Sequence, residues 1–387
     1  MDNATEPTLN PYSWNEYANM LYVDQPFSVG FSNEFESSDA SSASSSDSSS
    51  SSSSCDQSPS ICDALAVNST VSAASNVWKL LQAFYAQFPQ YENRDFGIFT
   101  ESYGGHYGPE FASYFESQNK AIASGSATGQ NISLVALGIN NGWYDSKIQE
   151  KAYIDFSLNN TYAPLINQTE YTAILDAYNA QCVPALQNCT GLIGDDEGCL
   201  NADLTCMMVV DNELDSNFNN PYDIRPNALQ PPAQYAEYLS RPDVMKAIGA
   251  KSEYQECSDS VSSDFYNTGD RMFSSLKGFE HNILTLIDAR SLLPALSSVV
   301  QSGVTTLIWA GDADYICNWF GGLGAVEAVN FTKQTEFQNL AVSNYTVNGT
   351  AGGTFKTVDN LSWLRVFGAG HEVPFYRELI CTRDFES

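Results

Sequence analysis

Positive charge is scarce in this chain of 387 residues. Lysine and arginine together number 17, against 46 aspartates and glutamates, and the formal net charge is −29 at pH 7. Such a chain repels nucleic acid and anionic membrane surfaces, so neither is expected as a partner. Long apolar runs are also missing, and no stretch is long enough to cross a bilayer. The opening residues lack a basic region followed by an apolar core, so no signal peptide is predicted in this sequence.

Cysteine, in contrast, is well represented, with nine copies. Cys182, Cys189, Cys199 and Cys206 are spaced nearly symmetrically, which favours two nested disulfides, Cys182–Cys206 and Cys189–Cys199. A metal site is less well supported, because the cluster has no C-x2-C pair and no nearby histidine. No metal or other cofactor is expected.

Sequons of the form N-x-S/T are frequent along the chain. One sequon is a weak signal, but many of them beside a cysteine cluster favour the secretory route. We therefore expect a secreted or vacuolar glycoprotein and an incomplete N-terminus. The asparagines that head the sequons are Asn3, Asn68, Asn131, Asn159, Asn167, Asn188, Asn330, Asn344, Asn348 and Asn360.

The distribution of strand-like and helical patterns along the sequence divides the chain into a core and an insertion. Residues 1–146 and 286–387 hold the strand-like segments, whereas 147–285 holds the cysteine cluster and short helical patterns. Residues 37–60 form a serine-rich, low-complexity loop with too few apolar residues to pack a core. Cys55 and Cys62 close this loop and are candidates for a local pair.

Alternating strands and helices predict a mostly parallel sheet with helices on both faces. Asn68–Thr70 predicts the N-terminal cap of a helix, since apolar residues recur at helical spacing from Val77 to Phe88. In a parallel sheet the site lies at the carboxyl ends of the strands. The predicted strands are 21–30, 96–99, 132–139, 305–310 and 363–367.

Histidine is the scarcest residue of chemical interest, with three copies. A serine hydrolase needs one histidine as general base. His371 follows the last predicted strand and is the candidate. His106 lies four residues after Ser102 and is expected beneath the site, and His281 is expected to be structural.

Ser102 stands between a predicted strand and a predicted helix, in Thr100-Glu101-Ser102-Tyr103-Gly104. This resembles the nucleophile elbow G-x-S-x-G of the α/β-hydrolase fold, which is the fold class we expect. Glycines allow the sharp turn of the elbow, and Thr100 replaces the first of them here. The alternative is an ordinary serine at a helix N-cap. The acid of a triad falls between serine and histidine in this fold, where Asp312 and Asp314 follow a strand. The pattern leaves both aspartates open.

Five segments together resemble the signatures of the serine carboxypeptidases, most closely those of the secreted fungal branch. The resemblance spans nearly the whole chain. The segments are Asn10–Asn15, Val23–Pro26, Glu101–Tyr107, Gly311–Trp319 and Gly370–Pro374.

The resemblance implies a triad of Ser102, Asp314 and His371 that releases C-terminal amino acids from peptides. The backbone N–H of Tyr103 is then one oxyanion donor. Glu101 is then the group that binds the free carboxylate of the substrate. Two carboxyls pair well only when they share a proton, so a raised pKa of Glu101 and activity at acidic pH are expected.

The resemblance also assigns residues around the cut. Glu150 stands where an apolar residue is common, and we hypothesise that Glu150, with Glu372, favours basic side chains in the substrate. The alternative is that both glutamates point into solvent. Relatives also have a free thiol beside the site, at the position of Cys317. Three further positions line the pocket for the residue before the scissile bond: Ile316, Trp143 and Tyr153.

Parts of the family pattern have no match here. An early segment, W-x-N-G-G-P-G-C-S-S, carries a second oxyanion donor and the partner of Cys257 in relatives, so Cys257 is expected to be unpaired. The first strands and the closing helix of the family are also unmatched, which predicts an exposed apolar sheet edge. Two alternatives therefore stay open: an impaired member that only binds peptides or partners, and an acyltransferase or esterase on the same scaffold.

Overall fold

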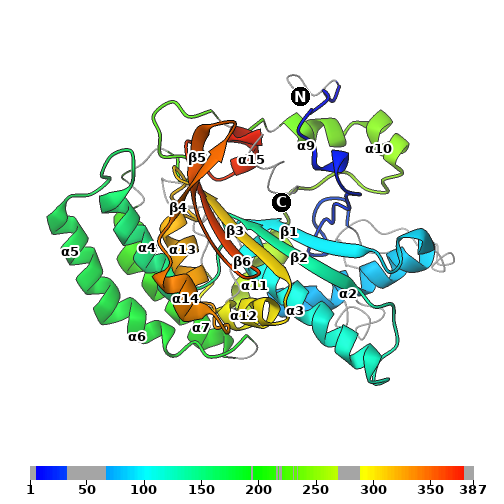
Figure 1. The fold of residues 1–387 in the computed structure, drawn as a ribbon, viewed down its shortest axis with the longest axis horizontal. Helices are drawn as coiled ribbons and strands as arrows, with labels where there is room; N and C mark the ends of the chain where they lie inside the picture. The colour runs from blue at the N-terminus through cyan, green and yellow to red at the C-terminus, as the bar shows by residue number, and fades with distance from the viewer. Residues whose placement is uncertain are drawn as a thin grey trace, which may run out of the picture.

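The computed structural model describes residues 6–32, 67–192, 195–214, 217, 220–229, 231–232, 234–268 and 288–378. The predictions for the serine-rich loop, His281, Asn3, Cys381 and the Cys55–Cys62 pair lie outside these residues. Figure 1 shows a central twisted sheet with helices packed around it.

The sheet has six strands in the order β1-β2-β3-β6-β5-β4. The first four in this order run parallel, β5 is antiparallel to β6, and β4 is antiparallel to β5. The mostly parallel sheet predicted from the sequence is confirmed. Its strands are β1 Asp95–Glu101, β2 Ser133–Asn140, β3 Thr305–Gly311, β4 Ser343–Val347, β5 Thr350–Val358 and β6 Leu361–Val366.

Apolar side chains that alternate along the strands divide between the two faces of the sheet. Leu137, Ile308 and Trp363 lie on one face, in a core shared with α3, α12 and α13. Trp309 and Leu364 lie on the other, beside the short helix α15. The core helices are α2 Thr70–Gln87, η3 Pro89–Tyr91, α3 Gly104–Ala123, α12 Leu293–Gln301, α13 Trp319–Ala328, α14 Gln334–Asn339 and α15 Val373–Tyr376.

The predicted helix after Asn68 begins with a reciprocal cap. Ser69 accepts a hydrogen bond from the backbone of Ser72, whose hydroxyl bonds back to the backbone of Ser69. This capping box satisfies two backbone donors that a helix start leaves open. Helix α2 then packs against α3, and Figure 1 shows where the two helices lie beside the sheet.

Between β2 and β3, the described residues form helices and contribute no strand to the sheet. This region holds two disulfides, Cys182–Cys206 and Cys189–Cys199, as the spacing of the cysteines predicted. The helices are α4 Ser146–Asn159, α5 Gln168–Ala177, η4 Tyr178–Cys182, α6 Val183–Leu186, α7 Asp196–Cys206, η5 Met207–Asp211, α8 Asn212–Leu214, α9 Gln234–Leu239, α10 Pro242–Ile248 and α11 Asp259–Thr268.

The strand predicted over 21–30 is wrong. This segment, after the short helix η1 Trp14–Glu16, forms a loop with a single bridge from Gly30 to Gln255. Ser28 and Gly30 both have positive φ, which breaks an extended strand. The carboxylate of Asp24 accepts a hydrogen bond from the N–H of Phe31 at 2.8 Å and closes the loop.

Candidate active site

Polar residues converge where the parallel strands end. Glu101 ends β1 and Ser102 follows it, Asn140 ends β2, and His371 follows β6. The amide of Asn140 donates to Glu101 Oε2 at 2.6 Å and to the carbonyl of His371 at 2.9 Å. Strand ends from distant parts of the sequence therefore meet in one cluster, as the parallel sheet predicts.

Ser102 lies in a sharp turn between β1 and α3. Its φ is +63°, in the left-handed region that non-glycine residues seldom adopt. Its N–H donates to Asn140 O at 3.0 Å, and its carbonyl accepts from the N–H of Trp143 at 2.9 Å. The N-cap of α3 is Tyr103, with no side-chain cap. The turn therefore has the geometry of a nucleophile elbow rather than of a capping serine.

Two glycines after Ser102 make room for this turn. A Cβ on Gly104 would lie 2.4 Å from Cβ of Thr100, which occupies the first glycine position of the usual motif. A Cβ on Gly105 would lie 2.4 Å from the carbonyl oxygen of Trp143. The Thr100 hydroxyl also donates to Gly104 O at 2.8 Å. The elbow thus tolerates Thr100 because Gly104 has no side chain.

His371 and Asp314 form a buried pair. His371 Nδ1 lies 3.0 Å from Asp314 Oδ2, and the two side chains are 3% and 0% exposed. Asp312 instead accepts hydrogen bonds from the Tyr162 hydroxyl at 2.6 Å and from the N–H of Gly368 at 2.8 Å. Of the two aspartates left open by the sequence pattern, Asp314 contacts the histidine and Asp312 ties loops together.

Asn141 is a site residue that sequence reasoning missed. Its amide donates to Asp314 Oδ2 at 2.6 Å, and its Oδ1 accepts from the N–H of Gly311 at 3.0 Å. The backbone N–H groups of Ile316 and Cys317 also donate to the Asp314 carboxylate. The carboxylate is therefore held from several directions. The signal was available in the sequence, since paired asparagines end a buried strand.

Electrostatics set the protonation of the two central groups. Burial raises the pKa of Glu101 to about 7, although the charge of His371 and the Asn140 hydrogen bond act against the rise. Burial alone would lower the pKa of His371, but the Asp314 carboxylate, with Glu101 and Glu372, outweighs it and raises the value to about 9. The two groups are coupled, because the charge on each stabilises the charge on the other.

The thiol of Cys317 lies within this cluster and is free and buried. Burial, together with the charges of Asp314 and Glu101, raises the pKa of the thiol well above its ordinary value. Cys317 therefore stays a neutral thiol. Cys257, expected to be unpaired, is free and exposed.

Aromatic rings build a wall beside the cluster. The ring of Tyr153 stacks on Trp143 at 5.8 Å and on Tyr315 at 4.8 Å, and its hydroxyl donates to Ile316 O at 2.7 Å. Glu150, one helical turn before, has zero exposure. Burial raises the pKa of Tyr153 well above its usual value, and the carboxylate of Glu150 adds to the rise. The residues predicted to line the pocket thus lie together.

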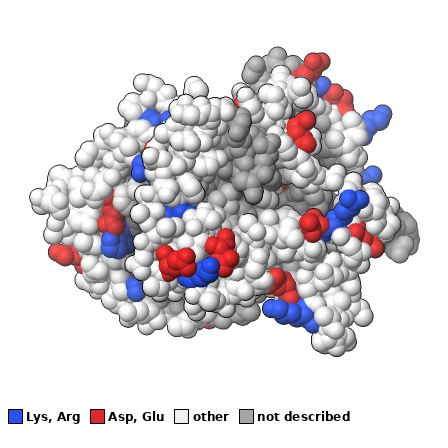
Figure 2. All heavy atoms as spheres, in the orientation of Figure 1, with Lys and Arg blue, Asp and Glu red and all other residues white. Residues whose placement is uncertain are grey.

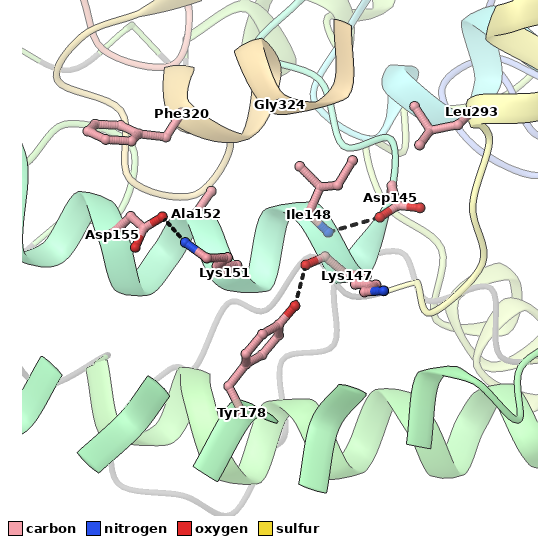
Figure 3. A pocket seen from close by; sticks show the side chains of 10 residues that line it. All are labelled: Asp145, Lys147, Ile148, Lys151, Ala152, Asp155, Tyr178, Leu293, Phe320 and Gly324. Atoms are coloured by element: carbon pink, nitrogen blue, oxygen red, sulfur yellow. Dashed lines mark hydrogen bonds and ion pairs between the residues drawn. The ribbon is translucent and has the colours of Figure 1, made fainter. Parts of the chain in front are cut away.

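A separate cavity of about 520 Å³ lies along the opposite side of helix α4 (Figure 3). The Lys151 ammonium pairs with Asp155 at 2.5 Å on its rim, and the Tyr178 hydroxyl donates to the carbonyl of Lys147. Helix α4 thus presents Tyr153 to the candidate site and its lysines to this cavity. The lining residues are Asp145, Lys147, Ile148, Lys151, Ala152, Asp155, Tyr178, Leu293, Phe320 and Gly324.

Basic and acidic side chains are interspersed on the surface. On the face drawn in Figure 2, basic and acidic side chains lie side by side in small groups. In the part of the chain that the structure describes, no helix has the length and apolar character needed to span a membrane. The same residues contain no group of three or more metal-ligating side chains.

Comparison with known proteins places this geometry in a family. The family model described as serine carboxypeptidase matches residues 1–385. Carboxypeptidase S1 of Penicillium janthinellum is 50% identical over 380 residues, covering 97% of this chain and 79% of the relative. Carboxypeptidase S1 homolog A of Arthroderma otae is 30% identical over 414 residues, covering 97% of this chain and 61% of the relative.

A solved structure has the same fold. The prohormone-processing carboxypeptidase KEX1(delta)P of Saccharomyces cerevisiae superposes with a TM-score of 0.72 at 20% identity, covering 98% of this chain and 75% of that one. The fold is thus that of an α/β hydrolase of the carboxypeptidase type. The chain belongs to the serine carboxypeptidase family, a family of peptide hydrolases. The resemblance and the enzyme class predicted from the sequence are confirmed at the level of the family.

Proposed function

We propose that this chain releases C-terminal amino acids from peptides through Ser102, His371 and Asp314, and does so best at acidic pH. The observation that carries the proposal is the 3.0 Å contact between His371 Nδ1 and Asp314 Oδ2, at the strand ends where Ser102 is held at φ +63°. Membership of the serine carboxypeptidase family supports it.

In the proposed reaction, Ser102 Oγ attacks the carbonyl of the last peptide bond while His371 takes the hydroxyl proton. The backbone N–H of Tyr103, at the start of α3, donates to the oxyanion that forms. His371 then gives its proton to the amine of the departing amino acid. Water, deprotonated by His371, hydrolyses the acyl-enzyme, and Asp314 holds the imidazole ring throughout.

Glu101 gives the proposal its specificity for chain ends. With its pKa raised to about 7, Glu101 carries a proton at acidic pH and donates a hydrogen bond to the terminal carboxylate of a peptide. Above that pH the two carboxylates repel each other. The preference for acidic pH is therefore one of substrate binding, which needs protonated Glu101. His371, whose pKa is raised to about 9, has to lose its proton before it acts as base, so a higher pH favours that step.

Glu150 and Glu372 form a second part of the proposal: they favour basic side chains next to the cut. The zero exposure of Glu150 supports this hypothesis over the alternative in which the side chain points into solvent. The charge of Glu150 is one of the causes that raise the pKa of Tyr153, whose ring stacks beside the site. The test compares cleavage of blocked Phe-Leu and Lys-Leu by the wild type and Glu150→Gln. Equal rates on the two peptides in the wild type would contradict this preference.

A secretory or vacuolar location and glycosylation complete the proposal. Two disulfides support an oxidising compartment. Asn360 is the weakest glycan site, because its amide nitrogen donates to the carbonyls of Val300 and Val304 at 2.9 and 2.7 Å and a sugar would break both bonds. The other described sequon asparagines are exposed: Asn68, Asn131, Asn159, Asn167, Asn188, Asn330, Asn344 and Asn348.

The experiment compares one blocked dipeptide with a free carboxyl, its C-terminal amide and its ethyl ester, at about pH 5. The proposal predicts release of the amino acid from the free acid, with much slower turnover of the amide. Hydrolysis of the ester alone would favour the esterase or acyltransferase alternative. Binding of the free acid by a folded protein that leaves all three intact would favour the alternative of an impaired peptide-binding member.

A further inference from the structure

A second acid–histidine pair lies directly beneath Ser102. His106 Nε2 is 3.3 Å from Asp288 Oδ2, and both side chains have zero exposure. The same carboxylate oxygen accepts a hydrogen bond from the Tyr103 hydroxyl at 2.8 Å. The other oxygen accepts from the N–H of Arg290 at 2.8 Å. The proposed reaction uses neither His106 nor Asp288.

The pair reaches both sides of the nucleophile elbow. On one side it holds the hydroxyl of Tyr103, the residue whose backbone N–H is the proposed oxyanion donor. On the other, His106 Nδ1 lies 2.6 Å from the carbonyl of Trp143, and the Trp143 indole N–H donates to Asp288 O at 3.3 Å. The N–H of Trp143 in turn donates to the carbonyl of Ser102.

The chemistry of these contacts makes the pair a fixed unit. His106 Nδ1 faces a carbonyl, which only accepts, so this nitrogen carries a hydrogen. Nε2 lies 3.3 Å from the Asp288 carboxylate, within ion-pair distance. A buried polar group held by such contacts is stabilised only while its partners stay in place. The arrangement therefore resists movement of the first turn of α3.

We propose that Asp288 and His106 are positioning residues for the hydrolytic reaction, acting through Tyr103 and Trp143 on the oxyanion donor and on Ser102. The inference rests on the proposed function for its reaction. An oxyanion donor stabilises the transition state only when it lies about 3 Å from the developing charge. A displacement of about 1 Å costs on the order of a hundredfold in rate. Anchoring Tyr103 at its ring end keeps that donor in place.

The test uses two variants in the full chain, Asp288→Asn and Tyr103→Phe. Tyr103→Phe keeps the backbone donor and removes only the hydroxyl, which contacts Asp288 and the Thr70 hydroxyl. We expect kcat to fall about tenfold in Tyr103→Phe and about 10–100-fold in Asp288→Asn, with KM within about threefold of wild type. The double variant should be no slower than Asp288→Asn alone, because both changes disrupt the same contact, between the Tyr103 hydroxyl and Asp288.

A matched control removes the same kind of bond elsewhere. Tyr171 donates to Asp155 at 3.0 Å on the helices of the insertion, so Tyr171→Phe loses one tyrosine–aspartate hydrogen bond away from Ser102. We expect its kcat to stay within twofold of wild type. An equal fall in Tyr171→Phe, or wild-type kcat in folded Tyr103→Phe, would overturn the proposal. Should Asp288→Asn not fold, Tyr103→Phe alone decides the question.

A second readout separates this inference from the carboxypeptidase proposal. An organophosphofluoridate phosphorylates an activated serine with loss of fluoride, whatever peptide the enzyme prefers, and mass spectrometry locates the label. We expect labelling of Ser102 to slow in Tyr103→Phe in parallel with kcat. If the wild type is labelled but releases no amino acid, the proposed function fails while the positioning inference is still tested. Equal labelling rates in wild type and both variants would overturn the inference alone.

Discussion

Replacing Glu101 with glutamine changes one property of the candidate site and preserves its shape. Glutamine still presents an N–H donor to a peptide carboxylate, but it does not ionise. In the wild type, burial raises the pKa of Glu101 to about 7, so the proton-bearing form dominates below that pH and is lost as pH rises through it. Glu101→Gln should therefore abolish the pH dependence of carboxylate binding.

The expected magnitude follows from the raised pKa. The proton-bearing fraction of Glu101 falls about tenfold between about pH 6 and pH 8, and wild-type KM for a free-acid peptide should rise by the same factor. In Glu101→Gln, KM should change less than about twofold over this range. The charge of Glu101 also raises the pKa of His371, so the variant should gain activity at a lower pH.

The assay is kcat and KM for a blocked Phe-Leu peptide from about pH 4 to pH 8.5, in the wild type and Glu101→Gln. The amidated peptide is the control, because it has no terminal carboxylate for Glu101 to bind. Its KM should show no rise near pH 7 in either protein. A KM for the free acid that climbs equally in the wild type and the variant would refute the assignment of Glu101.

Other predictions concern the supports of the site and the stability of the fold. Gly105→Ala places a Cβ 2.4 Å from the carbonyl oxygen of Trp143, so kcat should fall at least tenfold in a peptide-release assay. Asn141→Ala removes the 2.6 Å hydrogen bond to the site aspartate, and kcat should fall about tenfold with KM little changed. Replacing Cys182 and Cys206 by alanine opens a loop of 24 residues and should lower the free energy of unfolding in urea by about 2–4 kcal/mol.

Two substitutions serve as controls for these variants. A Cβ on Gly322, inside helix α13, meets no atom closer than 3.8 Å, so Gly322→Ala should keep full activity. Asn119 makes two hydrogen bonds to the backbone of Ile132 away from the strand ends, so Asn119→Ala should lose stability while its kcat is kept. Normal activity in folded Gly105→Ala, or equal loss of kcat in Asn119→Ala and Asn141→Ala, would contradict the roles given to these residues.

Much of the core was predictable because its signals are local. The strands before Ser102 and after residue 305 are short apolar runs that end in polar residues, and the structure has them as β1 and β3. The elbow was predictable because its turn depends on neighbouring residues. The loop over 21–30 was not, since positive φ at Ser28 overrides an apolar, strand-like composition.

The sequence analysis did not predict the β4–β5 hairpin, although the Asn-Gly pair at its turn is a signal for one. Asn348 and Gly349 have φ of 51° and 78°, as expected for an Asn-Gly turn between two antiparallel strands. The contacts of Asn141 and Asp288 could not be predicted in the same way. Each joins segments far apart in the chain, at separations of 173 residues for Asn141 and Asp314 and 185 for Tyr103 and Asp288. Only the folded sheet and its flanking helices bring such pairs together.

The central claim is that Ser102 attacks the last peptide bond. The most direct measurement is the rate of leucine release from blocked Phe-Leu at about pH 5, for the wild type and for Ser102→Ala with the same circular dichroism and melting temperature. The account predicts release by the wild type and a fall of at least a thousandfold in Ser102→Ala. Leucine release that persists in Ser102→Ala, or a folded wild type that releases none, would contradict it.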